Sequence, residues 1–145
     1  MKKTIYLILC CMFLVGSLGT ISYAATGDDY VVMPRFNNTA TTNTDFTIDG
    51  NGKATIQVSF VGYEGITTGA TIKVKLQKKF LFFFWQDVDI GTNGKVLQYE
   101  VTGDYCFNSY TLSLSKGTYR VQAEYEIRGT GGSADVITEE VECSY

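Results

Sequence analysis

Apolar and polar residues alternate with a period of two along much of the chain after Asp28. The alternation is clearest over Lys53–Val61, Thr71–Gln77 and Thr118–Arg128. Successive side chains of a β-strand point to opposite faces of a sheet, whereas this spacing cannot form one apolar stripe along a helix. The pattern therefore predicts strands with one buried and one exposed face. The positions predicted to face the core are Ala54, Ile56, Val58, Phe60, Ile72, Val74, Leu76, Tyr119, Val121, Ala123, Tyr125 and Ile127.

Less regular apolar segments and turn-forming residues complete the predicted fold. Further strands are expected at Tyr30–Phe36, Trp85–Ile90, Lys95–Val101, Tyr105–Leu114 and Asp135–Cys143. Turns rich in glycine, asparagine and aspartate separate them, and the polar segment Thr39–Thr44 is expected to be an exposed loop. Seven or eight short strands without a helix predict an all-β fold. We expect a single antiparallel β-sandwich of the immunoglobulin-like class over residues 25–145, rather than a closed barrel.

Tyr119 lies at the start of the predicted penultimate strand, directly after Gly117 and Thr118. In immunoglobulin-like sandwiches a tyrosine at such a corner often bonds back to the preceding connection. The sequence therefore offers two interpretations for Tyr119, a tyrosine corner of this type or an ordinary core tyrosine.

The first 24 residues have the features of a secretory signal peptide. Lys2 and Lys3 form the charged start, Ile5–Val15 forms the apolar middle, and Ser22-Tyr23-Ala24 is a cleavage site of the small-x-small type. The apolar part is shorter than the roughly 20 residues that a membrane-spanning helix needs. We therefore expect cleavage after Ala24 and a secreted protein, either extracellular or associated with the cell surface.

Removal of the signal peptide makes the chain more acidic. The remaining 121 residues contain 10 Lys or Arg and 15 Asp or Glu, a net charge of −5. Nucleic-acid binding requires a basic face, so this balance argues against a nucleic-acid partner. It also argues against tight binding to anionic lipid by charge alone.

Two cysteines remain after the signal peptide, Cys106 and Cys143. Exported proteins meet oxidising or redox-neutral surroundings, so a single disulfide between them is the leading interpretation, and two unpaired small residues are the alternative. The chain has no histidine, which leaves a zinc site without its usual ligands, and we expect no metal or other cofactor.

Residues for catalysis are scarce in this sequence. Without histidine, a serine or cysteine nucleophile lacks its usual base. The carboxylate pairs Asp87 with Asp89 and Glu139 with Glu140 could serve as general acid and base, but solvated strand faces with charges that discourage edge pairing are the simpler interpretation. Calcium at Asp28-Asp29 or at Asp87 and Asp89 lacks the ligand spacing of a calcium loop. We therefore expect a protein that is not an enzyme.

An unbroken apolar run occupies a position where a turn is expected, between the strand that ends near Gln77 and the strand that includes Val88. The run has high β-propensity and no charge or turn former, and Lys78, Lys79, Asp87 and Asp89 flank it. Three interpretations are open: the aromatics are divided between the core and a partly buried strand pair, they contact a protein partner, or they insert into a membrane interface. Carbohydrate stacking on Trp85 or on the tyrosines is a further possibility without an accompanying polar cluster. The residues of this candidate interaction hairpin are Phe80, Leu81, Phe82, Phe83, Phe84 and Trp85.

Short motifs occur in an order that resembles a family of small secreted β-sandwich proteins of unknown function from clostridia and related Gram-positive anaerobes. The motifs are Met33-Pro34-Arg35-Phe36, Gly52-Lys53-Ala54, Leu76-Gln77-Lys78-Lys79 with Trp85 and Val88, and Lys116-Gly117-Thr118-Tyr119-Arg120-Val121. The resemblance covers nearly all of residues 25–145 and implies an exported single sandwich, without catalytic or ligand residues to carry over. This chain departs from the pattern in two places: Phe80–Phe84 replaces a short polar loop, and the pair Cys106 and Cys143 is additional.

Together these observations predict a secreted or cell-surface, non-catalytic binding module whose ligand and oligomeric state the sequence does not identify. A membrane-active secreted effector that uses the hairpin Phe80–Trp85 is the first alternative. A carbohydrate-binding module or a carboxylate-dependent hydrolase is the second.

Overall fold

The computed structural model describes residues 36–91 and 94–145. The predicted signal peptide, Asp28-Asp29 and all of the predicted strand Tyr30–Phe36 except its last residue lie outside the described residues. The described chain forms eight strands and one short 3-10 turn: β1 (Thr39–Ile48), β2 (Lys53–Gly62), β3 (Thr67–Phe80), η1 (Leu81–Phe83), β4 (Phe84–Val88), β5 (Leu97–Thr102), β6 (Tyr105–Ser113), β7 (Thr118–Gly129) and β8 (Asp135–Ser144). Within these residues, no helix is long and apolar enough to cross a membrane.

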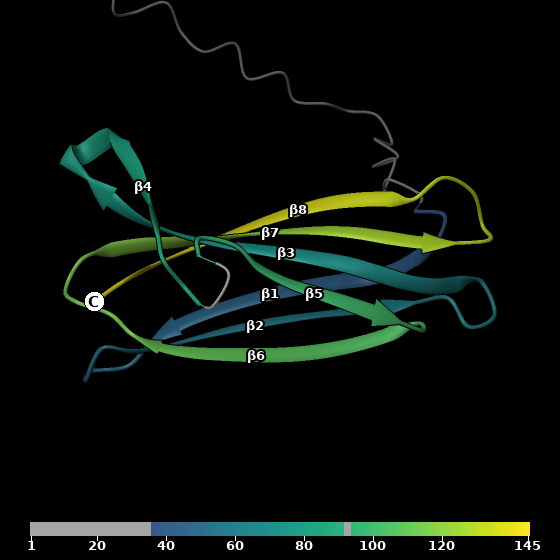
Figure 1. The fold of residues 1–145 in the computed structure, drawn as a ribbon, viewed down its shortest axis with the longest axis horizontal. Helices are drawn as coiled ribbons and strands as arrows, with labels where there is room; N and C mark the ends of the chain where they lie inside the picture. The colour runs from purple at the N-terminus through teal and green to yellow at the C-terminus, as the bar shows by residue number, and fades with distance from the viewer. Residues whose placement is uncertain (1–35, 92–93) are drawn as a thin grey trace, which may run out of the picture. The chain divides into compact units, whose positions relative to one another are not determined.

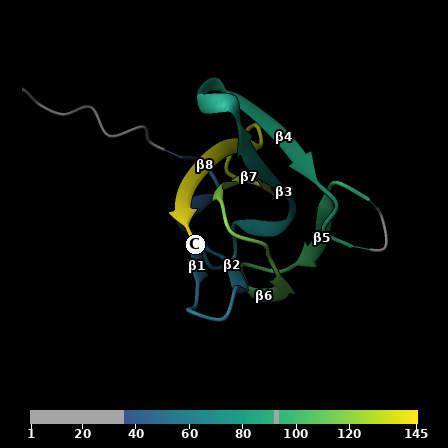
Figure 2. The ribbon, with the colours of Figure 1, turned by 90° about the vertical axis from the view of Figure 1, so that its left-hand side faces the viewer.

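The strands form two antiparallel sheets that face each other as a sandwich (Figures 1 and 2). The smaller sheet has the order β1-β2-β6, and the larger has the order β4-β3-β7-β8 with β5 also paired to β3. β4 and β5 lie one after the other along the same edge of β3, because β5 pairs with residues 69–74 and β4 with residues 76–80. The all-β, antiparallel part of the prediction is confirmed.

β3 is longer than the strand that supports it on its other edge. Its pairing with β7 ends at Lys78, which lies opposite Tyr119, whereas Lys79 and Phe80 pair only with Trp85 and Phe84 of β4. The β3–β4 hairpin therefore extends past the end of the sheet, and Figure 1 shows it projecting from the sandwich.

The core lies between the sheets and contains the positions that the alternation predicted. Ile56, Val58 and Phe60 of β2 and Val121 and Tyr125 of β7 are at most 2% exposed. Burial of such side chains contributes roughly 1.5–3 kcal/mol each relative to the exposed state. The other predicted inward positions of the three alternating segments are buried as well: Ala54, Ile72, Val74, Leu76, Tyr119, Ala123 and Ile127.

The prediction that Thr39–Thr44 is an exposed loop is wrong. These residues begin β1, which pairs antiparallel with β2. Thr39 and Thr44 are buried although they are polar, because each hydroxyl has a partner: Thr39 bonds to Asp135 over 3.0 Å and Thr44 to Tyr125 over 2.7 Å. A polar group can be buried at little cost when it is hydrogen-bonded, so the strand has inward positions without an apolar signature.

The predicted disulfide is also absent, since Cys106 and Cys143 are free thiols. Cys106 lies opposite Phe60 in the smaller sheet, near the end of β2 and the start of β3. Cys143 lies opposite Tyr119, level with the end of β3. A disulfide requires Cα atoms within about 7 Å, and these two residues lie at opposite ends of the sandwich. Burial raises the pKa of the Cys106 thiol, which keeps it in the unreactive protonated form.

A buried carboxylate connects the first described residues to the last strand. Asp135 accepts hydrogen bonds from the backbone amides of Asn37 and Asn38, over 2.9 and 2.7 Å, and from the hydroxyl of Thr39. Asn38 adds a bond from its side-chain amide to the carbonyl of Ser133, over 2.9 Å. Asp135 is only 6% exposed, so these donors replace the water that the carboxylate loses on folding.

Asp135→Ala should lower the free energy of unfolding by about 3 kcal/mol, because it leaves buried backbone amides without an acceptor. The measurement is chemical denaturation followed by circular dichroism. Asp45→Ala removes an exposed carboxylate from β1 and is the matched control, with an expected change within about 0.5 kcal/mol. Equal effects of the two substitutions would contradict the assigned role of Asp135.

The buried phenol of Tyr125 makes stability sensitive to alkaline pH. Its hydroxyl donates to the carbonyl of Asn43 over 2.9 Å and lies 2.7 Å from the hydroxyl of Thr44. Burial raises the pKa of Tyr125 from 10.0 to about 12. Between these two values the phenol ionises in the unfolded chain but stays protonated in the folded one, so unfolding is favoured as pH rises through this range.

The free energy of unfolding should therefore fall as pH rises from about 10 to about 12, and Tyr125→Phe should make that fall shallower. Urea denaturation at a series of alkaline pH values measures the slope. Tyr105→Phe changes an exposed tyrosine and should leave the slope as in the unaltered protein. A slope that is the same in Tyr125→Phe would contradict this account.

Candidate functional site: the aromatic hairpin

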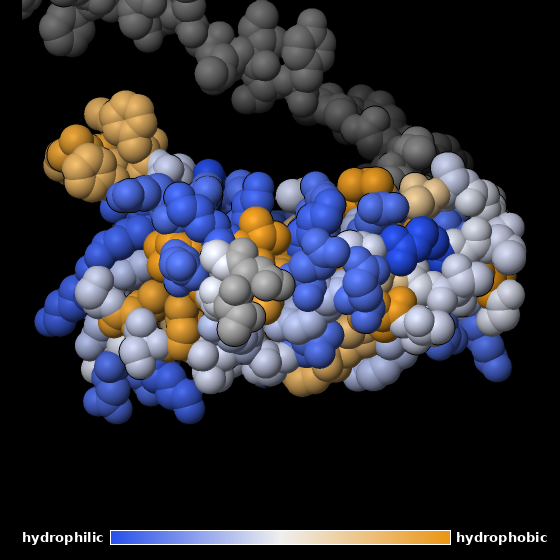
Figure 3. All heavy atoms as spheres, in the orientation of Figure 1, coloured by the Kyte–Doolittle hydropathy of each residue, from blue (hydrophilic) through white to orange (hydrophobic). Residues whose placement is uncertain are grey.

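The tip of the β3–β4 hairpin exposes a continuous group of large apolar side chains, which we call the aromatic tip. It consists of Phe80, Leu81, Phe82, Phe83 and Phe84, with exposed fractions of 56%, 62%, 85%, 80% and 64%. Figure 3 shows an apolar cluster projecting from a surface on which polar and apolar groups are mixed. The interpretation that these aromatics belong to the core is therefore wrong. Contiguous exposed apolar groups of this kind usually mark contact sites.

The backbone at the aromatic tip is strained. Leu81 and Phe82 have φ angles of 44° and 43°, a left-handed conformation that costs roughly 1–2 kcal/mol per residue for side chains larger than glycine. The ring centroids of Phe82 and Phe83 are 6.3 Å apart, and those of Phe83 and Phe84 are 6.4 Å apart, within the range of favourable aromatic pairs. Strain of this kind tends to concentrate at functional sites.

Trp85 anchors the outer face of the hairpin base. The centre of its ring lies 4.4 Å from the guanidinium carbon of Arg120 and 5.4 Å from Nζ of Lys79, so two cations contact the ring. Arg120 comes from β7, which lies on the far side of β3 from Trp85. The stack therefore connects the edge strand β4 to the interior of the larger sheet.

A row of hydrogen bonds extends this anchor across four strands. Nε of Arg120 donates to Gln77 Oε1 over 2.7 Å, and Nε2 of Gln77 donates to Asp87 over 2.7 Å. Nη1 of Arg120 pairs with Glu140 of β8 over 3.0 Å. Because every polar group in the row has a partner, the outer face of the hairpin base is held in one arrangement.

Lys78 and Tyr119 hold the inner face of the hairpin base. The hydroxyl of Tyr119 donates to the carbonyl of Ser115 over 2.8 Å, which confirms the tyrosine-corner interpretation. Nζ of Lys78 lies 5.3 Å from the centre of the Tyr119 ring and donates to Oγ of Ser115 over 2.8 Å. Lys78 also passes so close to Gly117 that a Cβ there would lie 2.7 Å from its Cε. The connection between β6 and β7 therefore packs against Lys78 and supports the inner face of the hairpin base.

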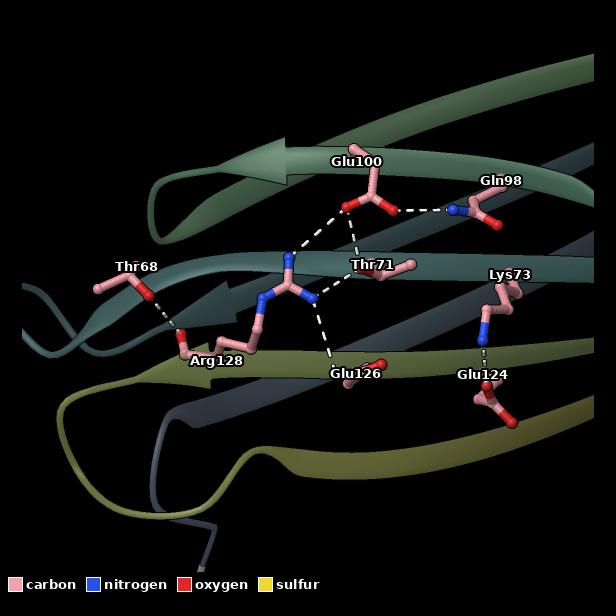
Figure 4. A network of polar contacts seen from close by, with 8 residues as sticks. All are labelled: Thr68, Thr71, Lys73, Gln98, Glu100, Glu124, Glu126 and Arg128. Carbon is pink, nitrogen blue, oxygen red and sulfur yellow. Dashed lines mark hydrogen bonds and ion pairs between the residues drawn. The ribbon is translucent and has the colours of Figure 1, made fainter.

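A second polar network lies on the outer face of the same sheet, away from the hairpin (Figure 4). Arg128 donates to Thr71 over 2.7 Å and pairs with Glu100 over 3.5 Å and with Glu126 over 3.7 Å. Hydrogen bonds from Thr71 and Gln98, together with Arg128, lower the pKa of Glu100. Lys73 pairs with Glu124 over 3.2 Å. All these charges are partnered along an exposed strand face, where ion pairs contribute little to stability.

The carboxylates considered for catalysis are hydrogen-bonded to other groups of the chain. Glu140 binds Arg120 and Gln122, whereas its neighbour Glu139 accepts a bond from Thr42. Asp87 binds Gln77, and Asp89 accepts the amide of Gly91. Across residues 36–91 and 94–145, no group of three or more His, Cys, Asp or Glu side chains lies close enough to hold a metal ion.

The apolar run in the sequence predicts the aromatic tip but not the residues that support it. Gln77 and Arg120 occupy polar positions of the alternating strands and carry no further signal. Their contribution depends on the register that places Gln77 between Asp87 and Arg120, and no local pattern indicates a register. In the sequence, Trp85 alone indicates that such supporting residues exist, because a large aromatic side chain on an edge strand needs a packing partner.

Arg120→Met should loosen the hairpin base, because it removes the cation over Trp85 and the bonds to Gln77 and Glu140. Trp85 is the sole tryptophan of the chain, so acrylamide quenching of its fluorescence reports this directly and should increase. Arg128→Met alters the other arginine of β7 and is the matched control. If both variants quench like the unaltered protein, Arg120 does not hold the hairpin.

Comparison of the chain with protein-family models, with curated proteins and with solved structures gave no match. The function proposed below therefore rests on the aromatic tip, on its two strained residues Leu81 and Phe82, and on the side chains that support the hairpin base.

Proposed function

We propose that this protein is a secreted or cell-surface, non-catalytic binding module that contacts its target through the aromatic tip. One observation carries the proposal: Phe82 and Phe83 are 85% and 80% exposed at the end of a projecting hairpin. Burial of each such ring in a contact would be favourable by roughly 1.5–3 kcal/mol.

The surroundings of the aromatic tip support a functional role. Leu81 and Phe82 adopt left-handed φ angles although neither residue is glycine. Both faces of the hairpin base are held by side chains, Arg120 against Trp85 on one and Lys78 against Tyr119 on the other. A surface held in its binding arrangement before contact loses less conformational entropy on binding.

The fold supports an immunoglobulin-like class. A sheet β1-β2-β6 faces a sheet β4-β3-β7-β8, and the tyrosine corner at Tyr119 occurs at the start of the penultimate strand, as in that class. Many binding domains of cell surfaces are sandwiches of this kind. Export through the signal peptide 1–24, and membership of the clostridial family that the sequence resembles, are part of the same proposal.

A non-catalytic role is supported by the engagement of the candidate carboxylates. Glu140 pairs with Arg120 and Asp87 binds Gln77, so both contribute to holding the hairpin rather than facing a common reacting point. General acid–base catalysis requires two groups within reach of one substrate.

Cell association provides the test. The full chain, with its own leader, should be expressed in a Gram-positive secretion host, and the fraction bound to cells should be compared with the fraction in the medium by immunoblot. The unaltered protein should be found with the cells, and Phe82→Ser combined with Phe83→Ser should move most of it to the medium, because the exposed rings provide the contact.

Phe107→Ser is the matched control, since Phe107 is an exposed phenylalanine, 55% exposed, on β6 of the other sheet. It should leave the distribution unchanged. The proposal fails if the double variant and the unaltered protein divide equally between cells and medium.

A further inference from the structure

We infer that the target of the aromatic tip is the interfacial region of a lipid bilayer. This inference rests on the proposed function, because it takes the aromatic tip as the contact element and identifies the material that it contacts.

The aromatic tip is apolar on every side. Phe80 and Phe84 lie opposite each other across the hairpin, and Leu81, Phe82 and Phe83 close its end. All five are at least 56% exposed, and none carries a polar side-chain group. A protein surface covers one side of a contact element, whereas a bilayer surrounds an inserted tip with apolar groups.

The residues at the base of the hairpin fit the boundary between lipid and water. Lys79 and Trp85 lie opposite each other in the hairpin, next to the opposed residues Phe80 and Phe84. Tryptophan is enriched at membrane interfaces, and lysine side chains there extend toward the headgroups. From this pair to the end of the turn is one strand step of about 3.4 Å and up to two 3-10 steps of about 2 Å, or about 7 Å altogether. Interfacial segments insert to about 5–10 Å, so the tip matches that depth.

The charges around the hairpin base are arranged for a surface that carries phosphate groups. Lys78, Lys79 and Arg120 all lie at the base, and the aromatic tip itself has no charged residue. Glu140 pairs with Arg120, Glu142 lies opposite Arg120 in β8, and Asp87 accepts a hydrogen bond from the neutral amide of Gln77. Along the hairpin, Lys79 and Lys78 lie nearer to the aromatic tip than Asp87 does, so the charges that would first meet the headgroups are basic.

The size of the tip also favours lipid over a second copy of the chain. Stable protein–protein interfaces bury about 800 Å² on each partner and involve 20–30 residues a side. The aromatic tip offers five apolar residues on a convex projection. Insertion into a bilayer needs no complementary surface, because lipid chains adapt to the inserted side chains.

Trp85 makes the inference directly measurable. As the sole tryptophan at the predicted water–lipid boundary, it should shift its emission to shorter wavelength when vesicles of phosphatidylcholine with a minority of phosphatidylglycerol are added to the purified protein without its leader. Co-sedimentation with the same vesicles gives the affinity. Phe82→Ser with Phe83→Ser should weaken vesicle binding by at least about tenfold, which corresponds to the burial of one phenylalanine ring.

Phe107→Ser, at an exposed ring away from the hairpin, should bind vesicles like the unaltered protein. Circular dichroism and thermal unfolding verify that each variant is folded, and the double variant should unfold at the same or a higher temperature because the rings it loses are exposed. The inference is overturned if the emission does not shift, if the double variant binds as well as the unaltered protein, or if ultracentrifugation shows that self-association without vesicles produces the same shift.

The outcomes separate this inference from the proposed function. If cell association depends on Phe82 and Phe83 while vesicles are not bound, the aromatic tip is a contact element for another partner and the lipid inference falls alone. If neither cells nor vesicles respond to the double variant, both fall.

Discussion

The pairing of β3 with β7 is the interaction on which the rest of the structure depends. It brings the longest strand, 14 residues, into the interior of the larger sheet, with its other edge available to β4 and β5 in succession. Since the pairing ends with Lys78 opposite Tyr119, it also determines where β3 leaves the sheet. The residues that follow have support on one edge only, and that is why a hairpin projects at this point.

A projecting hairpin of this length would be marginal by itself, because an isolated pair of strands has little to bury. Here, side chains from β7 and from the β6–β7 connection support the base of the hairpin on both faces. Arg120 does so through Trp85, and Tyr119 through Lys78. The support ends where the aromatic tip begins, so the stabilised part and the exposed part of the hairpin are adjacent but distinct. This division explains how the chain tolerates two left-handed residues and four exposed phenylalanines in one short segment.

The fold was predictable wherever the inward positions are apolar, as in β2, β3 and β7, because the period of two appears directly in the sequence. β1 was missed since Thr39 and Thr44 are buried with partners, Asp135 and Tyr125, that lie far away along the chain. The disulfide prediction failed for a related reason, as two cysteines in one chain say nothing about which end of the sandwich each occupies. The aromatic tip was visible as an apolar run, but its exposure was not, because burial depends on how far β7 extends beside β3.

The hydrogen bonds of Asp135 and those of Tyr145 hold the first and the last described residues at opposite ends of the sandwich. Asn37 and Asn38 are bound at the start of β8, whereas Tyr145, at the other end of β8, exchanges backbone hydrogen bonds of 3.0 and 2.9 Å with Gly117 beside Lys78. The first described residues are therefore far from the hairpin, and the last residue is next to its base. An affinity handle or surface linkage placed ahead of Asn37 would leave the phenylalanines free to meet a vesicle, while one placed after Tyr145 would crowd them.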